Sequence, residues 1–272
     1  MQALNEETRA FTPCKKDWFI MSMLRYVAFP VLLLLTILPS AAQDKKKPSP
    51  KIEPRVIFSL PLGATPGKTT KLTLRGSDLD NAKEVKILDG KGSAKILNKG
   101  KAGAPDKNPD KVGDTQVEIE LKLNDKLTGE SVTLVVVTSN GETKPHSILI
   151  EPAILEKEPN DGFRSAQAIT LPTVVEGSIG RAKDVDLFRF EGKIGQKVLA
   201  EVLASRHGSP LDAILTLYDA KGEQLAANDD FTKEHRDARI EALLPADGVY
   251  FLSLIDAHDS GSNLHVYRLV VK

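Results

Sequence analysis

Hydrophobic and polar residues alternate in short runs along most of the chain. In residues 115–123 (TQVEIELKL), the apolar side chains Val117, Ile119, Leu121 and Leu123 alternate with polar or charged ones. Successive side chains of a strand point to opposite faces, so this period of two buries one face and leaves the other in water. No segment sustains the 3.6-residue period of an amphipathic helix. The pattern predicts an all-β protein.

Residues 55–152 form the first group of predicted strands. They are Arg55–Leu60, Thr70–Gly76, Glu84–Leu88, Thr115–Leu123, Ser131–Thr138 and His146–Ile150. Ser139-Asn140-Gly141 predicts a hairpin turn between the last two, because Asn and Gly tolerate positive φ. Residues 99–114 are polar and predict a long loop. Six or seven short strands in about 100 residues favour an immunoglobulin-like sandwich.

Residues 153–272 form a second group, which begins after the short junction Glu151-Pro152. Its predicted strands are Thr173–Ile179, Asp186–Phe190, Lys197–Ala204, Ala213–Tyr218, Glu223–Ala227, Ala238–Leu243, Gly248–Ile255 and His265–Val271. Eight short strands at this spacing predict a jelly-roll-like sandwich. The fold class expected is therefore all-β, with two β-sandwich domains.

The apolar run Val27–Leu38 follows Arg25 and precedes the small residues of Pro39–Ala42. A basic flank, a short apolar core and small residues predict a secretory signal peptide in residues 1–42, cleaved after Ala42. Translation from Met21 or Met23 would give a more ordinary signal. The run is shorter than the roughly 20 residues of a membrane-spanning helix, so no membrane span is expected after cleavage. We expect a secreted or periplasmic protein.

Residues 43–54 are rich in Lys and Pro and predict a semi-extended linker. Over the whole chain, 37 basic residues balance 37 acidic ones, so no net field attracts nucleic acid or an anionic membrane. The one cysteine, Cys14, excludes a disulfide framework and Cys-based metal sites.

Candidate chemistry concentrates in Glu156-Lys157-Glu158-Pro159-Asn160-Asp161. Residues two apart in an extended segment share a face, so the side chains of Glu156, Glu158 and Asn160 would point together, with Asp161 at the bend. The same spacing in Asp184-Val185-Asp186 offers two further carboxylates. Oxygen ligands of this kind suit Ca²⁺, which takes 6–8 of them, and no His or Cys lies nearby in sequence to favour zinc. A charged surface strand is the alternative.

A second acidic group comprises Asp212, Asn228, Asp229, Asp230 and Asp237. The sequence leaves open whether these residues form a second metal site. A solvated turn is the alternative for residues 228–230.

Two stretches resemble known families. Gly63-Ala64-Thr65-Pro66-Gly67-Lys68 followed by Leu72–Leu79 (LTLRGSDL) is similar to the opening of IPT/TIG-type immunoglobulin-like domains. This resemblance implies a fold with a spacer or binding role.

Residues 153–272 resemble the bacterial pre-peptidase C-terminal domain, related to collagen-binding domains of bacterial collagenases. The motifs, in order, are Glu156–Asp161, Asp184–Phe190, Gly208–Ala213, Leu217–Asp219 with Asn228–Asp230, Leu244–Tyr250 and Tyr267–Leu269. The resemblance implies a β-sandwich of secreted bacterial proteins. It also implies calcium as the cofactor, with Glu156, Glu158, Asn160, Asp161, Asp184 and Asp186 as metal ligands. Relatives often follow a peptidase domain, and here an immunoglobulin-like module precedes instead.

Catalytic motifs are absent from the sequence: it has no His-Glu-x-x-His, no Gly-x-Ser-x-Gly and no Walker loop. His207, Ser209 and Asp212 could be imagined as a triad, and Asp184 with Asp186 as a glycosidase pair. We expect a non-enzymatic, secreted, calcium-stabilised protein that attaches to an extracellular protein or polysaccharide. The alternatives are a stability or secretion accessory of a separately encoded hydrolase, and a hydrolase with an unrecognised acidic site.

Overall fold

The computed structural model describes residues 53–88, 91–103, 109–233 and 236–272. The chain separates into residues 1–47 and residues 48–272. The predicted signal peptide and nearly all of the predicted linker lie outside the described residues. Neither helical segment of the described part, α1 (Pro109–Val112) or η1 (Ser205–His207), is long or apolar enough to cross a membrane.

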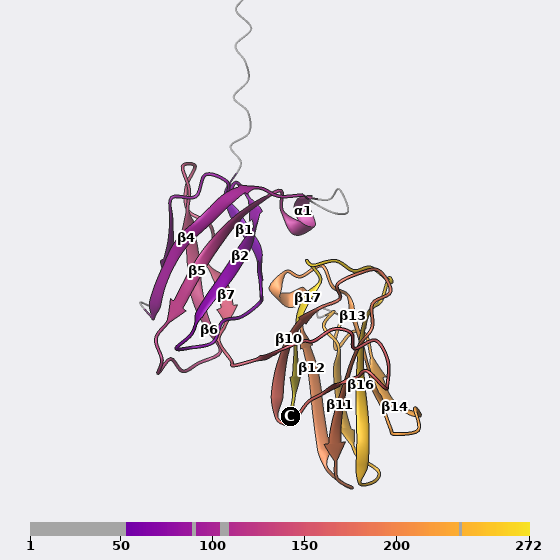
Figure 1. Cartoon of the computed structure of the whole chain (residues 1–272). Helices are drawn as coiled ribbons and strands as arrows, with labels where there is room; N and C mark the ends of the chain where they lie inside the picture. Colours follow the sequence, from indigo (N-terminus) through magenta and orange to yellow (C-terminus); the bar gives the residue numbers. More distant parts are fainter. Residues whose placement is uncertain (1–52, 89–90, 104–108, 234–235) are drawn as a thin grey trace, which may run out of the picture. The chain divides into compact units, whose positions relative to one another are not determined.

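The first sandwich is built from seven strands in two antiparallel sheets (Figure 1). The strands are β1 (Arg55–Leu60), β2 (Thr69–Ser77), β3 (Glu84–Ile87), β4 (Gly92–Lys101), β5 (Thr115–Leu123), β6 (Ser131–Val137) and β7 (His146–Leu149). One sheet has the order β1-β2-β5-β4 and the other β3-β6-β7. This is the strand order of a constant-type immunoglobulin sandwich. The alternating residues of β5 face inward, and Val117, Ile119 and Leu121 are fully buried.

The long loop predicted for residues 99–114 is wrong in part. Strand β4 continues to Lys101, and helix α1 occupies Pro109–Val112. Strand β4 lies at the edge of its sheet, its register shifts between Ile96 and Asn98, and most of its residues are exposed. An edge strand with so few buried positions shows no clear alternation of apolar and polar residues, so its sequence predicts a loop instead of a strand.

The second sandwich contains all eight strands that the sequence predicts, within one or two residues of their expected bounds, and two short additional ones. The strands are β8 (Ile154–Leu155), β9 (Gln167–Ala168), β10 (Thr173–Ser178), β11 (Asp186–Gly192), β12 (Lys197–Leu203), β13 (Ala213–Tyr218), β14 (Gln224–Asn228), β15 (Arg239–Leu243), β16 (Gly248–Asp256) and β17 (Val266–Val271). The sheets have the orders β15-β12-β17-β10-β8 and β14-β13-β16-β11-β9. Strands β10 to β17 thus follow the jelly-roll order.

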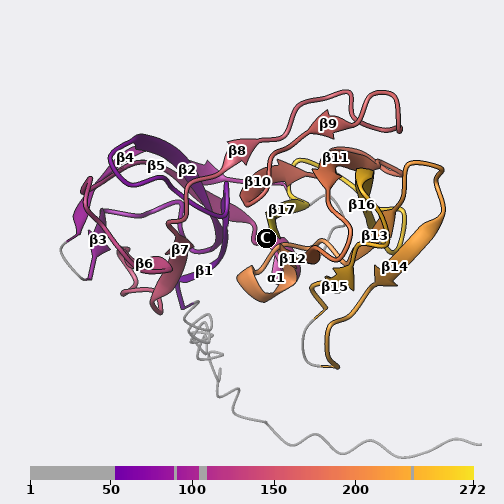
Figure 2. The same ribbon diagram turned by 90° about the horizontal axis from the view of Figure 1, so that it is seen from below.

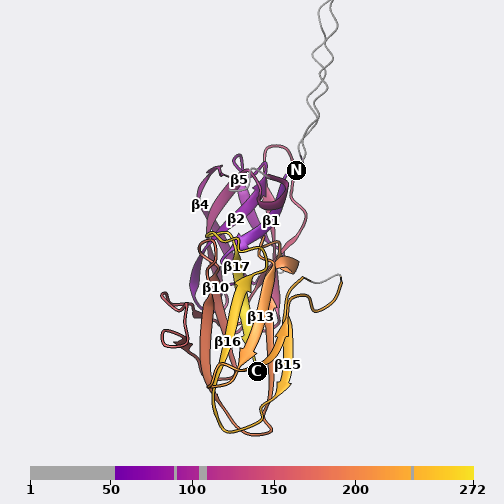
Figure 3. The same ribbon diagram turned by 90° about the vertical axis from the view of Figure 1, so that its right-hand side faces the viewer.

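The two sheets of the second sandwich face one another as separate layers (Figure 2). Their long strands run side by side along the sandwich (Figure 3). Between the layers lies an apolar core that includes Phe188 and Phe190 from β11 and Tyr267 and Leu269 from β17. The short strands β8 and β9 each extend one sheet at the same side of the sandwich, by parallel pairing with β10 and β11. The acidic motif of residues 156–161 lies in the chain between them.

Candidate metal centre

Residues 154–161, here called the edge segment, pass from one sheet of the second sandwich to the other. At its start, the backbone N–H of Glu156 donates to the carbonyl of Glu176 in β10, at 2.9 Å. At its end, the carbonyl of Asn160 accepts the N–H of Leu187 in β11, at 3.0 Å. The edge segment therefore bridges the two sheets at the side of the sandwich, and its polar side chains lie at the edge of the apolar core.

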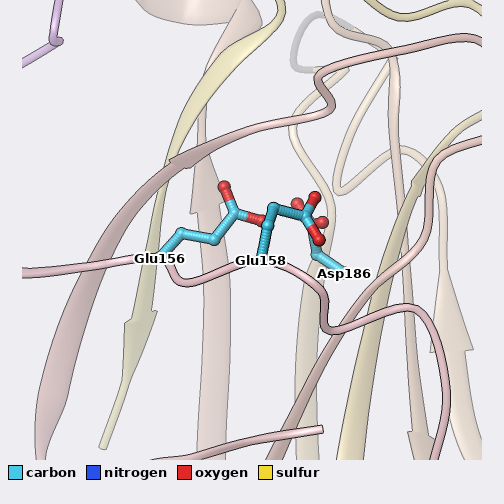
Figure 4. A group of neighbouring side chains, drawn as sticks. All are labelled: Glu156, Glu158 and Asp186. Atoms are coloured by element: carbon cyan, nitrogen blue, oxygen red, sulfur yellow. The ribbon is translucent and has the colours of Figure 1, made fainter. Parts of the chain in front are cut away.

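Three carboxylates meet where the edge segment approaches β11. One oxygen from each of Glu156, Glu158 and Asp186 lies within 4.8 Å of the other two. Figure 4 shows the three side chains turned toward one another, two from the edge segment and one from the start of β11. Asp186 is fully buried, Glu156 is half-buried and Glu158 is exposed. This acidic triad has the ligand types and spacing to hold a metal ion.

Glu156 is held by two hydrogen bonds, and the absence of a side chain at Gly177 leaves room for its carboxylate. Its Oε2 accepts the backbone N–H of Ser178 at 2.8 Å, and its Oε1 accepts Nδ2 of Asn160 at 3.1 Å. Beside it, a Cβ at Gly177 would lie 2.6 Å from Oε2 of Glu156 and 2.5 Å from the hydroxyl oxygen of Tyr267. Such distances are far below van der Waals contact, so the site requires glycine at this position.

Asp186 is held from inside the core. The hydroxyl of Tyr267 donates to Oδ2 of Asp186 at 2.7 Å, and both residues are fully buried. Oδ1 of Asp186 and Oδ1 of Asn160 are also buried, and neither has a hydrogen-bond partner among the described residues. Oδ1 of Asp184 is the third such buried oxygen among the described residues without a hydrogen-bond partner, although it forms an ion pair with Arg181. Leaving a buried acceptor without a hydrogen bond costs about 1–3 kcal/mol, so the unpaired oxygens of Asp186 and Asn160 fit a site that receives a cation.

The electrostatics of the triad are unfavourable for carboxylates alone. Burial, followed by the proximity of Glu156, raises the pKa of Asp186 well above its ordinary value. Although Glu158 is exposed, partial loss of hydration raises its pKa, and the nearby charges of Asp184, Glu156 and Asp161 raise it further. Both shifts have the sign expected for carboxylates that lack a compensating cation.

The two remaining residues of the predicted ligand set have another partner. Asp161 and Asp184 both contact the guanidinium of Arg181, and Asp184 also accepts the backbone N–H of Gly180 at 2.7 Å. Asp184 and Asp186 are both buried, whereas Val185 packs with a separate apolar cluster that contains Leu187. The structure thus gathers Glu156, Glu158, Asn160 and Asp186 at one point and places Asp161 and Asp184 around Arg181.

The second acidic group does not form such a cluster in the described part of the chain. Asp237 accepts the backbone N–H groups of Ser205 and Arg206 and the Nε of Arg206. Asn228 donates to the carbonyl of Asp230, as in a closed turn. Asp212 lies 3.5 Å from a guanidinium nitrogen of Arg236 and 3.7 Å from a ring nitrogen of His258, and Asp229 accepts the N–H of Asp230. These contacts belong to loops and turns.

The three residues considered as a triad are not joined either. Within the described residues, no hydrogen bond or ion pair connects the side chains of His207, Ser209 and Asp212; Ser209 Oγ instead accepts the N–H of Leu211.

Three residues of the site were missed by reasoning from the sequence. Tyr267 and Gly177 reach it from β17 and β10, neighbouring strands that pair at these two residues. Arg181 lies only three residues before Asp184, and a basic residue at that spacing was the one local signal available.

Comparisons with known proteins give partial matches to bacterial proteins. No family model matches the chain. It is 42% identical over 100 residues to a probable subtilase-type serine protease of Deinococcus radiodurans, a match that covers 36% of this chain and 14% of the protease. The chain therefore spans a small part of that relative's length.

Solved structures include similar chains at low identity. The pre-peptidase C-terminal domain of collagenase from Bacillus anthracis is 18% identical with a TM-score of 0.31, and the match covers 45% of this chain and 98% of that one. The protein SGBP-B of Bacteroides ovatus, solved in complex with a mixed-linkage heptasaccharide, is 9% identical with a TM-score of 0.23, covering 72% of each chain. The resemblance to the pre-peptidase C-terminal domain is confirmed. The resemblance to IPT/TIG domains stays a prediction.

Proposed function

We propose that this chain is a secreted or periplasmic, non-catalytic binding or accessory protein whose second sandwich is stabilised by a calcium ion. The observation that carries the proposal is the meeting of the acidic triad with two buried, unpartnered oxygens at the margin of the core. The proposed ligands are Glu156, Glu158, Asn160 and Asp186, with Asp161 and Asp184 completing the acidic cluster around them.

The donor chemistry favours calcium over other common metals. The donors are carboxylate and amide oxygens, which hard cations prefer, and zinc sites are typically built with His or Cys. Ca²⁺ accepts 6–8 oxygens in flexible geometry. Because the edge segment is partly exposed, water molecules can supply the ligands that the protein side chains do not. Extracellular calcium modules bind in the range of about 0.1–1 mM, which matches the proposed compartment.

The role of the ion would be to close the side of the sandwich. Glu156 and Glu158 belong to the edge segment, whereas Asp186 begins β11 and contacts Tyr267 of the opposite sheet. An ion shared by these groups ties the edge segment to both layers. Binding to the folded state alone stabilises it by about 2.7 kcal/mol at a hundredfold excess over Kd.

Thermal unfolding with and without calcium tests this function. We expect the melting temperature of the second sandwich to rise in 5 mM CaCl₂ relative to a chelator, and isothermal titration calorimetry to detect calcium binding. Glu156→Gln and Glu158→Gln should remove both effects. Glu191→Gln is the matched control: Glu191 lies exposed on β11, and its substitution removes the same charge at a position outside the triad. Identical melting curves in calcium and in chelator would refute the proposal.

An exposed aromatic group supports a binding role for the outer face of the sheet that contains β11. Phe163 is 45% exposed, and its ring lies edge-on to Phe251 and Tyr218, with centroid distances of 4.8 and 5.7 Å. Tyr250 and Tyr267, by contrast, are buried in the core. Aromatic rings of this kind provide contact area for an extracellular protein or polysaccharide. Phe163→Ala should weaken capture of such a partner without changing calcium binding.

A second candidate function is support for a separately encoded secreted hydrolase. It is favoured by the 42% identity to part of a subtilase-type protease, in which a segment like this one accompanies a protease. Affinity capture from the culture medium of the source organism, with cell-wall polysaccharide and collagen tested in parallel, separates the two candidates. A hydrolase as the specific partner favours the accessory role; a polymer favours attachment.

A further inference from the structure

Arg181 lies between two carboxylates of the acidic cluster. It belongs to the loop between β10 and β11, and its Nη2 contacts Oδ1 of Asp161 while its Nη1 lies 2.7 Å from Oδ1 of Asp184. Asp161 comes from the edge segment and Asp184 from the approach to β11. A single guanidinium therefore links the same two elements that the acidic triad links.

The two carboxylates differ in how much they need a cation. The side chain of Asp184 is 0% exposed, and that of Asp161 is 40% exposed. A fully buried carboxylate is costly unless it is paired and hydrogen-bonded. Asp184 is paired with the partly exposed guanidinium of Arg181 at Oδ1, where it has an ion pair but no hydrogen bond, and it accepts the N–H of Gly180 at Oδ2. Removing Arg181 would leave the oxygen at Oδ1 without a compensating charge.

The carboxylates around Arg181 also act on the triad. Asp184 and Asp161 are close enough to Glu158 to raise its pKa. The cluster thus contains five carboxylates, and one divalent ion at the triad would balance only part of their charge. The guanidinium supplies one further positive charge at the side of the cluster that Asp161 and Asp184 form.

We infer that Arg181 fills the place of a second cation, so that the cluster binds a single divalent ion in this chain and would bind two without the guanidinium. The inference rests on the proposed calcium site and defines its stoichiometry. A planar guanidinium can contact two carboxylates at once through separate N–H groups. Without the guanidinium, a divalent ion bridging Asp161 and Asp184 would take over these two contacts.

Counting the bound ions tests the inference. Isothermal titration calorimetry and equilibrium dialysis with calcium, on the purified protein at pH 7.5, should give one ion per chain for the wild type and two for Arg181→Gln. In the double variant Arg181→Gln/Asp161→Asn the count should return to one, because the second position loses a carboxylate. Arg164→Gln is the matched control, since Arg164 is exposed and forms no ion pair among the described residues, and its count should stay at one.

The outcomes that contradict the inference are distinct from failure of the calcium site. A count of one for Arg181→Gln, with or without a change in affinity, overturns the role of Arg181. A count of zero in both the wild type and Arg181→Gln overturns the proposed calcium site itself. If Arg181→Gln does not fold in a chelator, its folding in 10 mM calcium decides: refolding with two bound ions supports the inference, and a protein that stays unfolded or binds only one ion overturns it.

Discussion

Tyr267 and Asp186 join the two sheets of the second sandwich through one hydrogen bond inside the core, of 2.7 Å from the tyrosine hydroxyl to Oδ2. They lie 81 residues apart in sequence. This bond engages Oδ2 of Asp186, and the other oxygen, Oδ1, is buried without a hydrogen-bond partner among the described residues. The orientation of a candidate ligand is thus set by a residue that belongs to the apolar core.

Replacing Tyr267 with Phe should therefore weaken calcium binding while preserving the packing of the ring. Oδ2 of Asp186 would lose its donor, at a cost of about 1–3 kcal/mol, and the carboxylate would be free to rotate. Titration calorimetry should show at least a severalfold loss of calcium affinity. Tyr250→Phe is the control, because its hydroxyl donates to the carbonyl of Ala246 at 2.6 Å, and this variant should keep wild-type affinity. Equal affinities in the two variants would contradict the positioning role of Tyr267.

Asp186→Asn should change stability in opposite directions with and without calcium. In a chelator, the wild type holds a carboxyl group whose pKa is raised by burial and by Glu156, so a neutral amide of the same shape should stabilise the protein, by roughly 2 kcal/mol. In calcium, the variant should gain nothing from the ion. Thermal unfolding at pH 7.5 under both conditions measures this crossover. A variant less stable than the wild type in chelator would show that the carboxyl group of Asp186 does not destabilise the metal-free protein.

Most of the fold could be predicted because its strands are half-buried. Strand β5 alternates along its whole length, and its predicted and observed bounds are the same, Thr115–Leu123. Strand β4 escaped prediction because it is an edge strand in which mainly Ala94 and Ile96 pack against the core. Alternation reports burial on one face, and where a strand buries little, the signal disappears.

The candidate site could be predicted only where it is local in sequence. The two-residue spacing of Glu156 and Glu158, and of Asp184 and Asp186, indicated the acidic residues directly. Their grouping depends on which strands become neighbours in space. The requirement for glycine at position 177 arises from the approach of Tyr267 and Glu156, which no local pattern contains.

Gly177→Ala should disrupt the site by volume alone. The added Cβ would lie within 2.6 Å of atoms from both Glu156 and Tyr267, so at least one of these side chains must move. We expect lower stability in calcium and a loss of most of the calcium-dependent rise in melting temperature. Gly100→Ala is the matched control, because a Cβ there meets nothing within 4 Å on strand β4. A normal calcium response in Gly177→Ala would show that the site tolerates displacement of Glu156.

His146 should limit stability in mild acid, independently of calcium. Burial lowers its pKa from 6.5 to about 4, and the charge of His207 adds a smaller repulsion. Below pH 6.5 the unfolded chain binds a proton at this residue that the folded protein does not bind, so stability falls as the pH decreases toward 4. The full effect is on the order of 3 kcal/mol.

Chemical denaturation between pH 7.5 and 4.5 should show this loss, and His146→Gln should reduce the slope because glutamine does not titrate. His258→Gln is the control, since His258 is exposed, with 72% of its side chain accessible. Its profile should follow that of the wild type. If His146→Gln kept the wild-type slope, the acid sensitivity would have to come from other groups, because a histidine that stays neutral in the folded state must contribute to it.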